Sequence, residues 1–181
     1  MVPLQRWFLH AMRAQAFAKV PSGGRLLEIG AGTGLNFEHY PPNLIGVATE
    51  PSRAMMDIAR QKGRPERVLL VQSQAEHLPF AGKTFDAALA TLVLCSVVSA
   101  EEALAELRRV VKPGGAVVLL EHVRPSGLLG LIFDLLNQIS VWLFADRLNR
   151  RTAETATAAG FEVLEREKRL LGIINLIVCR V

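Results

Sequence analysis

The stretch "RLLEIGAGTG" (residues 25–34) decides the fold and points to the functional site. Its apolar run has the length of a buried strand and ends in three glycines at alternate positions, Gly30, Gly32 and Gly34. Ligands of open α/β sheets bind beyond the carboxyl ends of the strands, and a glycine there lets a ligand approach the backbone because no Cβ atom is in the way. A tight turn needs only one or two such glycines. Three favour a nucleotide-type binding loop.

An acidic residue follows at the distance that such a loop requires. Glu50 ends the next apolar run, "LIGVATE" (44–50), twenty residues after Gly30. A carboxylate in this place can accept hydrogen bonds from both hydroxyls of a ribose. The dinucleotide fingerprint is G-x-G-x-x-G, whereas the third glycine here arrives one residue early. The spacing alone leaves a dinucleotide, a nucleoside sulfonium and a simple turn open.

The rest of the chain alternates strand and helix patterns. Strands are predicted at 25–30, 44–49, 67–72, 85–90, 115–123, 161–166 and 172–181, and helices at 4–19, 52–62, 100–111, 126–145 and 150–159. Short, nearly all-apolar strands separated by helices indicate a parallel sheet covered on both faces. The linker "EKRLL" (167–171) is too short for a parallel crossover, so the last two strands are expected to form an antiparallel hairpin at one edge.

Composition and charge narrow the class of protein. At 181 residues, half of them apolar and 21% charged, the chain is expected to form one ordered domain. Its net charge is +4, and the first 27 residues hold four cations and no acid: Arg6, Arg13, Lys19 and Arg25. A cationic end suits an anionic lipid surface or nucleic acid. One tyrosine and no dense basic stripe argue against nucleic acid.

Two segments carry the apolar side chains that bear on membrane contact. Residues 1–22 are predicted to form an amphipathic helix, with a stripe of Leu4, Trp7, Phe8, Ala11 and Met12. This helix would cap the sheet or an active site, and an interfacial membrane helix is the alternative. The run 127–145 is long enough to span a bilayer, but polar residues at its middle argue against that. A helix over 126–145, apolar on two sides, is expected to be buried or to wall an apolar pocket.

The cysteines and the first residues place the chain in the cytoplasm. Cys95 and Cys179 fit no disulfide framework and no metal-ligand spacing, so no metal site is expected. Cys95 is predicted to be a small buried residue, and Cys179 to be structural in an edge-strand pattern. The N-terminus has no long apolar region of the kind that a signal peptide needs.

Four motifs in a fixed order settle the choice of ligand. They are "LEIGAGTG" (27–34), "GVATEPSRAMMDIAR" (46–60), "SQAEHLPFAGKTFDAALATLVL" (73–94) and "LRRVVKPGGAVVLLEHV" (107–123). From about Arg25 to the C-terminus this series resembles the class I S-adenosylmethionine-dependent methyltransferases. The resemblance implies a three-layer Rossmann-like α/β fold with a doubly wound, mostly parallel seven-stranded sheet and an antiparallel last strand. It also implies one methyltransferase domain over residues 1–181, with S-adenosyl-L-methionine as cofactor and S-adenosyl-L-homocysteine as product.

The resemblance also implies roles for particular residues. The loop would contact the methionine moiety of the cofactor, with Glu28 as the acid of its motif, and Glu50 would hold the ribose hydroxyls. Pro51 and Ser52 would border the adenine, Gln74 to Glu76 would meet its edge, and "TLVL" (91–94) would line the space beneath the sulfonium. The predicted cofactor-binding residues are therefore Glu28, Gly30, Ala31, Gly32, Thr33, Gly34, Glu50, Pro51, Ser52, Gln74, Ala75, Glu76, Thr91 and Leu92. "KPGG" (112–115) would be the turn before the fifth strand.

Several features resemble a small branch that includes membrane-associated alkyl-thiol methyltransferases, with phospholipid and quinone methyltransferases as broader kin. They are "LEIGAGTGLNFEHYPP", "TLVLCSV", "LLEHV" and "LNRRTAETATAAGF". The branch implies a small apolar or amphiphilic acceptor, a thiol or a lipid headgroup amine, with peripheral membrane contact through the N-terminal helix. Residues 145–147 depart from the Gly-Cys-His-type stretch of these relatives, and the acceptor-side segment is expected at 124–150.

The remaining polar residues give one candidate for catalysis. His122 ends the fifth strand on the ligand side and is the candidate general base, or alternatively shapes the pocket. His39 and Tyr40 follow the glycine loop, where they would cover the cofactor or lie on the surface. Arg124, Arg147 and Arg150 are candidate contacts for an anionic group. A non-catalytic cofactor- or lipid-binding module and an NAD-type oxidoreductase are the rival functions, and the sequence does not define the oligomeric state.

Overall fold

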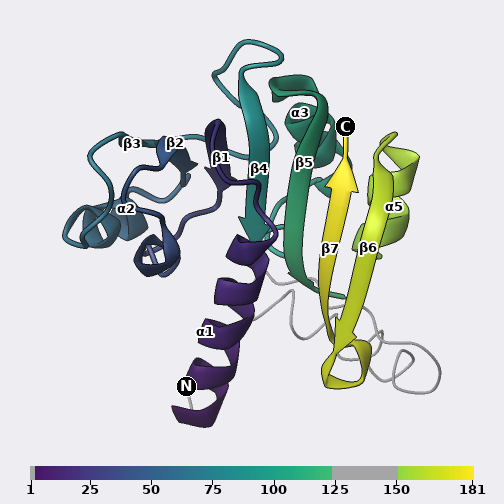
Figure 1. Cartoon of the computed structure of the whole chain (residues 1–181), viewed down its shortest axis with the longest axis horizontal. Coiled ribbons are helices and arrows are strands. Elements are labelled where there is room, and N and C mark those ends of the chain that lie inside the picture. Colours follow the sequence, from purple (N-terminus) through teal and green to yellow (C-terminus); the bar gives the residue numbers. More distant parts are fainter. Residues whose placement is uncertain (1–2, 124–150) are drawn as a thin grey trace.

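The computed structural model describes residues 3–123 and 151–181, with residues 3–7 as backbone only. Its centre is a seven-stranded sheet in the order β3-β2-β1-β4-β5-β7-β6 (Figure 1). The strands are β1 (Arg25–Ile29), β2 (Ile45–Thr49), β3 (Val68–Val71), β4 (Phe85–Thr91), β5 (Val111–His122), β6 (Glu162–Arg169) and β7 (Ile174–Arg180). Neighbours β1 to β5 pair in parallel, whereas β7 runs antiparallel to both β5 and β6. The predicted doubly wound α/β sheet with a reversed last strand is confirmed.

Helices cover both faces of the sheet. The structure has α1 (Pro3–Ala18), α2 (Arg53–Arg60), α3 (Ala100–Val110) and α5 (Thr152–Ala158), with the short 3₁₀ turns η1 (Phe37–His39) and η2 (Leu170–Gly172). Ser52 and Ser99 cap α2 and α3, because each hydroxyl accepts a hydrogen bond from a backbone N–H of the first turn. The predicted helix over 126–145 lies outside the described residues. Within the described residues, no helix is long and apolar enough to cross a bilayer.

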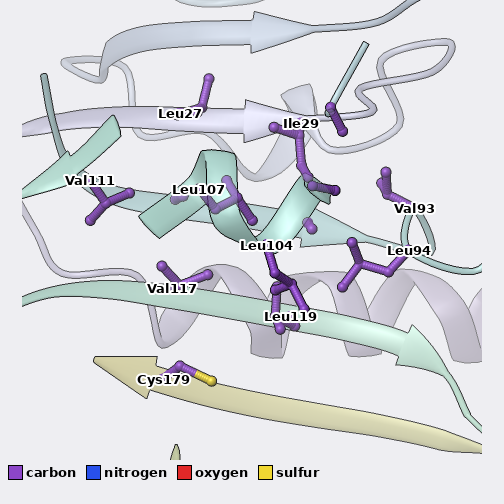
Figure 2. Close-up of a cluster of buried hydrophobic side chains, with 14 of the residues drawn as sticks. Leu27, Ile29, Val93, Leu94, Leu104, Leu107, Val111, Val117, Leu119 and Cys179 are labelled. Atoms are coloured by element: carbon purple, nitrogen blue, oxygen red, sulfur yellow. The ribbon is translucent and has the colours of Figure 1, made fainter. Parts of the chain in front are cut away.

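Alternate residues of the central strands build two separate cores. Leu27 and Ile29 of β1 face α3 and α5, in a cluster that includes Leu104 and Leu107 (Figure 2). Leu26 points to the other face, where Met12, Ala16 and Phe17 of α1 pack with Phe37 and Tyr40 of the segment around η1. Because successive side chains of a strand point to opposite faces, Glu28 lies on the same face as Leu26. The sheet therefore places this acid beneath α1 and η1.

The N-terminal cations are largely used inside the fold. Lys19 pairs with Glu165 at 2.8 Å and with Glu167 at 3.7 Å, both on β6. The Arg25 guanidinium lies over the Phe85 ring, 5.5 Å from its centroid. Arg13 contacts Thr91 at the carboxyl end of β4. The expectation that this cationic end suits an anionic lipid surface stays a prediction, although Arg13 and Lys19 already have partners within the fold. The acids that neutralise Lys19 are more than 140 residues away in the chain.

Two details of the sheet differ from the sequence prediction. The "KPGG" segment belongs to β5, whose register shifts between the Phe85–Val111 and Ala87–Ala116 pairs, and is not a turn that precedes the strand. Cys179 lies on β7, which is flanked by β5 and β6 and is therefore interior, not at the edge. Both cysteines are buried as expected. Burial raises the pKa of the Cys179 thiol to about 11, so this thiol stays protonated at neutral pH.

Candidate active site

A cavity of about 480 Å³ lies at the carboxyl ends of β1, β2 and β4. The segments that follow these strands wall it, together with α1 and the loop after β3. The lining residues are Arg13, Gly30, Ala31, Gly32, Thr33, Leu35, Glu50, Pro51, Ser52, Met55, Gln74, Ala75, Glu76, Thr91, Leu92, Val93, Ser96, Val97 and Val98. Of the predicted cofactor-binding residues, all but Glu28 and Gly34 are in this set. Segments far apart in the sequence thus meet at one place.

A second cavity, of about 560 Å³, lies at the opposite ends of the strands, among Gly82, Lys83, Val111 and Pro113. It is slightly larger, but none of the predicted site residues lines it. Ligands of doubly wound sheets bind at the carboxyl ends, where the strand order reverses, and β1 lies at that point between β2 and β4. The cavity beside the glycine loop is therefore the candidate active site.

Two glycines in the loop have distinct structural roles. Gly30 has a φ of +62°, and a Cβ atom there would lie 2.4 Å from Val93 Cγ2, so the close packing of the loop on the turn after β4 requires a glycine. Gly32 also has a positive φ, of +56°, but nothing lies within 4 Å of the place where its Cβ would be. Because Gly32 lines the cavity, this open space is available to a ligand.

Glu50 holds the glycine loop and the start of α2 at once. Its Oε2 accepts a hydrogen bond from the Gly32 N–H at 3.0 Å, and its Oε1 accepts one from the Ser52 N–H at 2.9 Å. The residue is 6% exposed and lines the cavity. A carboxylate has about four lone-pair sites, so each oxygen can accept a further hydrogen bond from a ligand. Both oxygens of Glu50 therefore have acceptor sites left for a ligand in the cavity.

Glu28 lies beneath the loop and takes part in a buried polar network. Its Oε1 accepts from Asn36 Nδ2 at 2.7 Å, and its Oε2 accepts from the Tyr40 hydroxyl. Burial raises the pKa of the Glu28 carboxyl, although Tyr40, Asn36 and Arg13 oppose that shift. Burial and the neighbouring carboxylate likewise hold the pKa of Tyr40 well above its usual value. Glu28 therefore supports the loop from below and does not line the cavity.

Arg13 of α1 joins this network to the cavity, which the sequence did not indicate. Its Nη1 donates to Asn36 Oδ1 at 2.8 Å and to Thr91 Oγ1 at 2.9 Å. Figure 1 shows the C-terminal half of α1 at the arrowhead end of β4, where Thr91 lies. Burial lowers the pKa of Arg13, and Glu28 opposes that shift. The guanidinium stays charged, because arginine is not deprotonated in proteins. The sequence around Arg13 shows only an amphipathic helix and does not indicate this role. The partners, Thr91 of β4 and Asn36 before η1, come from other parts of the chain.

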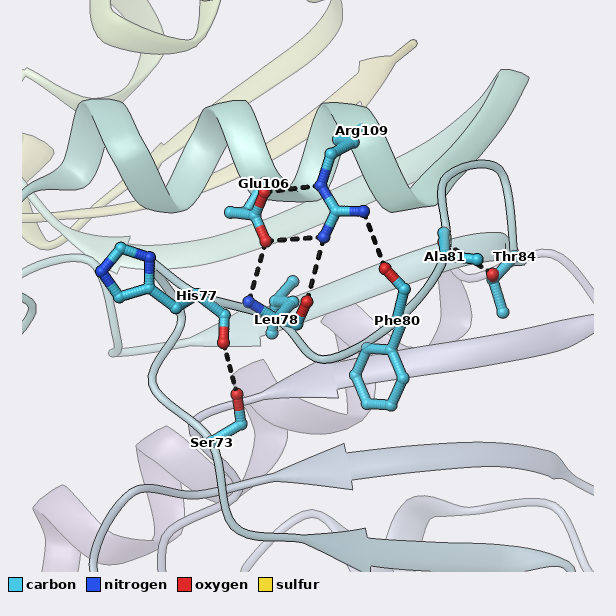
Figure 3. Close-up of polar contacts among 8 residues, drawn as sticks. All are labelled: Ser73, His77, Leu78, Phe80, Ala81, Thr84, Glu106 and Arg109. Atoms are coloured by element: carbon cyan, nitrogen blue, oxygen red, sulfur yellow. Dashed lines mark hydrogen bonds and ion pairs between the residues drawn. The ribbon is translucent and has the colours of Figure 1, made fainter.

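The loop after β3 is fixed from α3 (Figure 3). Glu106 accepts from the Leu78 N–H at 2.8 Å, and Arg109 donates to the carbonyls of Leu78 and Phe80 at 3.0 and 2.7 Å. The two side chains also pair with each other at 2.6 Å, which lowers the pKa of Glu106. This clamp positions the preceding residues, Gln74 to Glu76, against the cavity.

The segment after β4 closes the remaining wall. Leu92 has a φ of +58°, a strained conformation for a bulky residue that tends to occur at functional sites. The buried Glu121 of β5 accepts from the N–H groups of Val93 and Leu94 at 3.0 and 3.1 Å and so fixes the turn. Glu76 Oε1 accepts from the Val98 N–H at 2.8 Å, which ties this segment to the loop after β3.

Other predicted residues lie away from the cavity or beyond the described part of the chain. His122 ends β5 as expected but is not among the residues that line the cavity. Tyr40 is buried under the loop and His39 lies next to His10, so neither covers the cavity. The expectations for Arg124, for residues 145–147, for Arg150 and for the acceptor-side segment 124–150 fall on residues that the structure does not describe.

Comparison with known proteins gives a consistent result. Residues 27–119, just over half of the chain, match the family described as "Methyltransferase domain". The chain is 35% identical over 115 residues to the thiol S-methyltransferase TMT1B of Rattus norvegicus, a match that covers 60% of this chain and 47% of the relative. It is 33% identical over 129 residues to the ubiquinone/menaquinone biosynthesis C-methyltransferase UbiE of Haemophilus ducreyi, which covers 66% and 47%. The aligned segment thus spans about half the length of these curated relatives.

A solved structure extends the likeness to the whole fold. A SAM-dependent methyltransferase from Thermotoga maritima superimposes with a TM-score of 0.72 at 26% identity, and the match covers 98% of this chain and 94% of that one. The glycine loop, Glu50 and all the described residues that line the cavity, except Arg13, lie within the segment that matches the family.

Proposed function

The chain belongs to the class I S-adenosylmethionine-dependent methyltransferases, and from that premise we propose that it methylates a small apolar or amphiphilic acceptor, a thiol in the first place. A lipid headgroup amine is the second candidate. The observation that carries the choice is the set of charged residues around the cavity: among the described lining residues, it consists of one cation and two acids, and both acids already accept backbone hydrogen bonds.

The cavity suits the cofactor of this family, S-adenosylmethionine, in shape and in polarity. Glu50 has acceptor sites left for the two ribose hydroxyls, and the space beside Gly32 admits a ligand close to the backbone. Gln74 offers an amide oxygen that could accept from an adenine amino group. Apolar lining residues such as Met55 and Val97 could pack against the faces of the adenine ring. When bound, the cofactor supplies an electrophilic methyl carbon on a sulfonium.

The residues of this chain contribute by positioning. Methyl transfer is an in-line displacement, so the acceptor atom must lie opposite the departing sulfur. Holding the two partners aligned supplies on the order of 7–11 kcal/mol of the barrier. The turn from Thr91 to Val93 is rigid, because Arg13 holds its hydroxyl and Glu121 holds its backbone. This turn is well placed to fix the distance between the acceptor and the methyl carbon.

The charges around the cavity favour a thiol over an amine. Among the described residues that line it, only Arg13, Glu50 and Glu76 are charged, and none is a lysine, histidine, aspartate, tyrosine or cysteine. Glu50 and Glu76 already accept backbone hydrogen bonds. A thiol as acidic as the cysteine side chain, with a pKa of about 8.5, is partly ionised near neutral pH without a dedicated base, and the Arg13 guanidinium favours the thiolate. A protonated amine, with a pKa of about 10.4, would need a base to remove its proton.

The test is mass spectrometry of the products formed by the full chain from S-adenosylmethionine and a panel of acceptors. The panel holds an amphiphilic cysteine-type thiol, phosphatidylethanolamine and a quinol. We expect the thioether, formed at a rate that rises with pH toward the pKa of the thiol. Methylation of the amine or of the quinol ring in preference to the thiol would overturn the choice of acceptor. Tight cofactor binding without any methylated product would overturn the proposed activity.

Replacing Gly32 by alanine should separate ligand binding from folding. The added Cβ meets no protein atom within 4 Å, so the variant should fold, with a loss of roughly 1–2 kcal/mol for the left-handed backbone. The methyl group would occupy the space that the cofactor needs, and we expect affinity for S-adenosylhomocysteine to fall at least ~10-fold, as for about 1.4 kcal/mol of lost binding energy.

Gly23 provides the matched control. It also has a positive φ, of +90°, and open space around its Cβ position, but it does not line the cavity. Gly23→Ala should lose similar stability in urea unfolding and keep its affinity in calorimetric titration. Equal affinities of the two variants would show that the space at Gly32 is not used by the cofactor.

A further inference from the structure

Three potential metal ligands meet beside the active site, where α1 packs against η1. His10 belongs to α1, whereas Glu38 and His39 belong to η1. His10 Nε2 lies 3.4 Å from Glu38 Oε2, and His39 Nε2 lies 4.0 Å from Glu38 Oε1. One ligand atom of each of the three residues lies within 4.8 Å of the others. The chain brings them together only on folding, so no ligand spacing is visible in the sequence.

His39 is the unusual member of the group. Its side chain is only 10% exposed, and within the described part of the chain its buried Nε2 has no hydrogen-bond partner. The carboxylate oxygen at 4.0 Å is beyond hydrogen-bond distance. A buried polar atom without a partner costs about 1–3 kcal/mol, so its position calls for a further binding partner. That partner would sit between His39, Glu38 and His10, because one ligand atom of each lies within 4.8 Å of the others.

We propose that His10, Glu38 and His39 bind one divalent transition-metal ion of the borderline class, for which Zn²⁺ is the probe. Two imidazoles and one carboxylate are a donor set that this class prefers, and three protein ligands leave one position for water. In a tetrahedral site with bonds of about 2.1 Å, the ligand atoms lie about 3.4 Å apart, so the widest separation, 4.8 Å, must close by roughly 1.4 Å. His10 and Glu38 are 52% and 56% exposed and are free to make that adjustment.

The ion would connect α1 to η1 directly beside the cofactor cavity. His10 lies one turn before Arg13, whose guanidinium lines the cavity and holds Asn36 and Thr91. η1 follows the glycine loop, and Phe37 and Tyr40 at its ends pack against the core of α1. The bound ion therefore fixes the helix that carries Arg13 against the segment that follows the loop, and it slows local opening of α1.

The experiment uses the full chain without a histidine tag, freed of metal with a chelator and titrated with Zn²⁺ in a calorimeter. No cofactor is present, so the result does not depend on the proposed methyl transfer. We expect one ion per chain. His10→Ala and Glu38→Gln each remove one ligand and should weaken binding at least ~10-fold, because even residues that only orient a ligand contribute that much. Both positions are exposed, so the variants should fold. His77→Ala, at an exposed histidine outside the group, should bind as the wild type does.

Hydrogen exchange gives a second readout. Zn²⁺ should slow exchange of the α1 amides in the wild type and in His77→Ala, but not in His10→Ala. The proposal is overturned if the wild type binds no Zn²⁺, or if His10→Ala and Glu38→Gln bind it as tightly as the wild type. It is also overturned if Zn²⁺ binds at one equivalent without changing exchange in α1, because the ion would then lie elsewhere.

Discussion

Replacing Glu50 by alanine is expected to weaken binding of S-adenosylmethionine and S-adenosylhomocysteine roughly 10²–10⁴-fold. The variant loses two charge-assisted hydrogen bonds to the ribose, each worth about 1.5–3 kcal/mol, and about 1.4 kcal/mol corresponds to a factor of ten in affinity. It also frees the Gly32 and Ser52 N–H groups, which Glu50 holds in the absence of ligand. Calorimetric titration with S-adenosylhomocysteine measures the effect without any need for the acceptor.

Two further variants show where the effect comes from. Glu66→Ala removes an exposed glutamate from the segment before β3 and should leave the affinity unchanged. Glu50→Gln keeps the size of the side chain but replaces one acceptor oxygen by a donor, which must face the Gly32 or the Ser52 N–H. Its affinity should lie between those of wild type and Glu50→Ala. If Glu50→Ala binds within a factor of three of the wild type, the assignment of Glu50 to the ribose is wrong.

Replacing Glu28 by alanine is expected to lower the free energy of unfolding by roughly 2–6 kcal/mol. Tyr40 and Asn36 would each lose a buried acceptor, and each loss costs about 1–3 kcal/mol. Asn36 keeps its hydrogen bond to Thr91, so the loss at Asn36 should lie near the lower value of about 1 kcal/mol. Urea unfolding of the two chains measures the difference. A loss below about 1 kcal/mol would mean that water or a rearranged side chain replaces the carboxylate.

The pH dependence of the same site has a definite sign. Burial raises the pKa of Glu28 above its usual value of about 4.5, so the folded state resists ionisation. The contribution of this carboxyl to stability is therefore fully present below that value and is lost as the pH rises through the higher folded pKa. Glu28→Gln cannot ionise and should lack this loss. The stability of the wild type relative to Glu28→Gln should fall as the pH rises above about 4.5. A constant difference would contradict the raised pKa.

The fold could be predicted because its signals are local. The short apolar strands, the glycines after β1 and the serine caps of α2 and α3 each reflect physics within a few residues. The linker between the last two strands was too short for anything but a hairpin, and that alone predicted the reversed strand. The errors arose where partners are distant: Cys179 was assigned to an edge because the position of β7 between β5 and β6 depends on pairing, which a single strand pattern does not encode.

Some residues of the candidate site could likewise be predicted from local sequence, and others could not. Glu50 could be predicted, because its distance from the glycine loop follows from one strand, one crossover and a second strand. Arg13 could not, since its partners Asn36 and Thr91 lie 23 and 78 residues away and its own surroundings resemble any amphipathic helix. Glu28 was expected at the cofactor, but the alternation of the strand turns it to the face beneath the loop, where Tyr40 and Asn36 satisfy it.

The sequence by itself determined the order of strands and helices and the place of the nucleotide loop, because spacing along the chain carries that information. The cofactor class followed from the resemblance of its ordered motifs to a known family. Only the tertiary structure decided which polar groups meet. It neutralised Lys19 with β6, placed Arg13 in the cavity wall, set Glu28 as support and gathered His10, Glu38 and His39 in one place. The physical reason is that a polar side chain takes its role from the charges and hydrogen-bond partners around it, and those partners come from other elements of the fold.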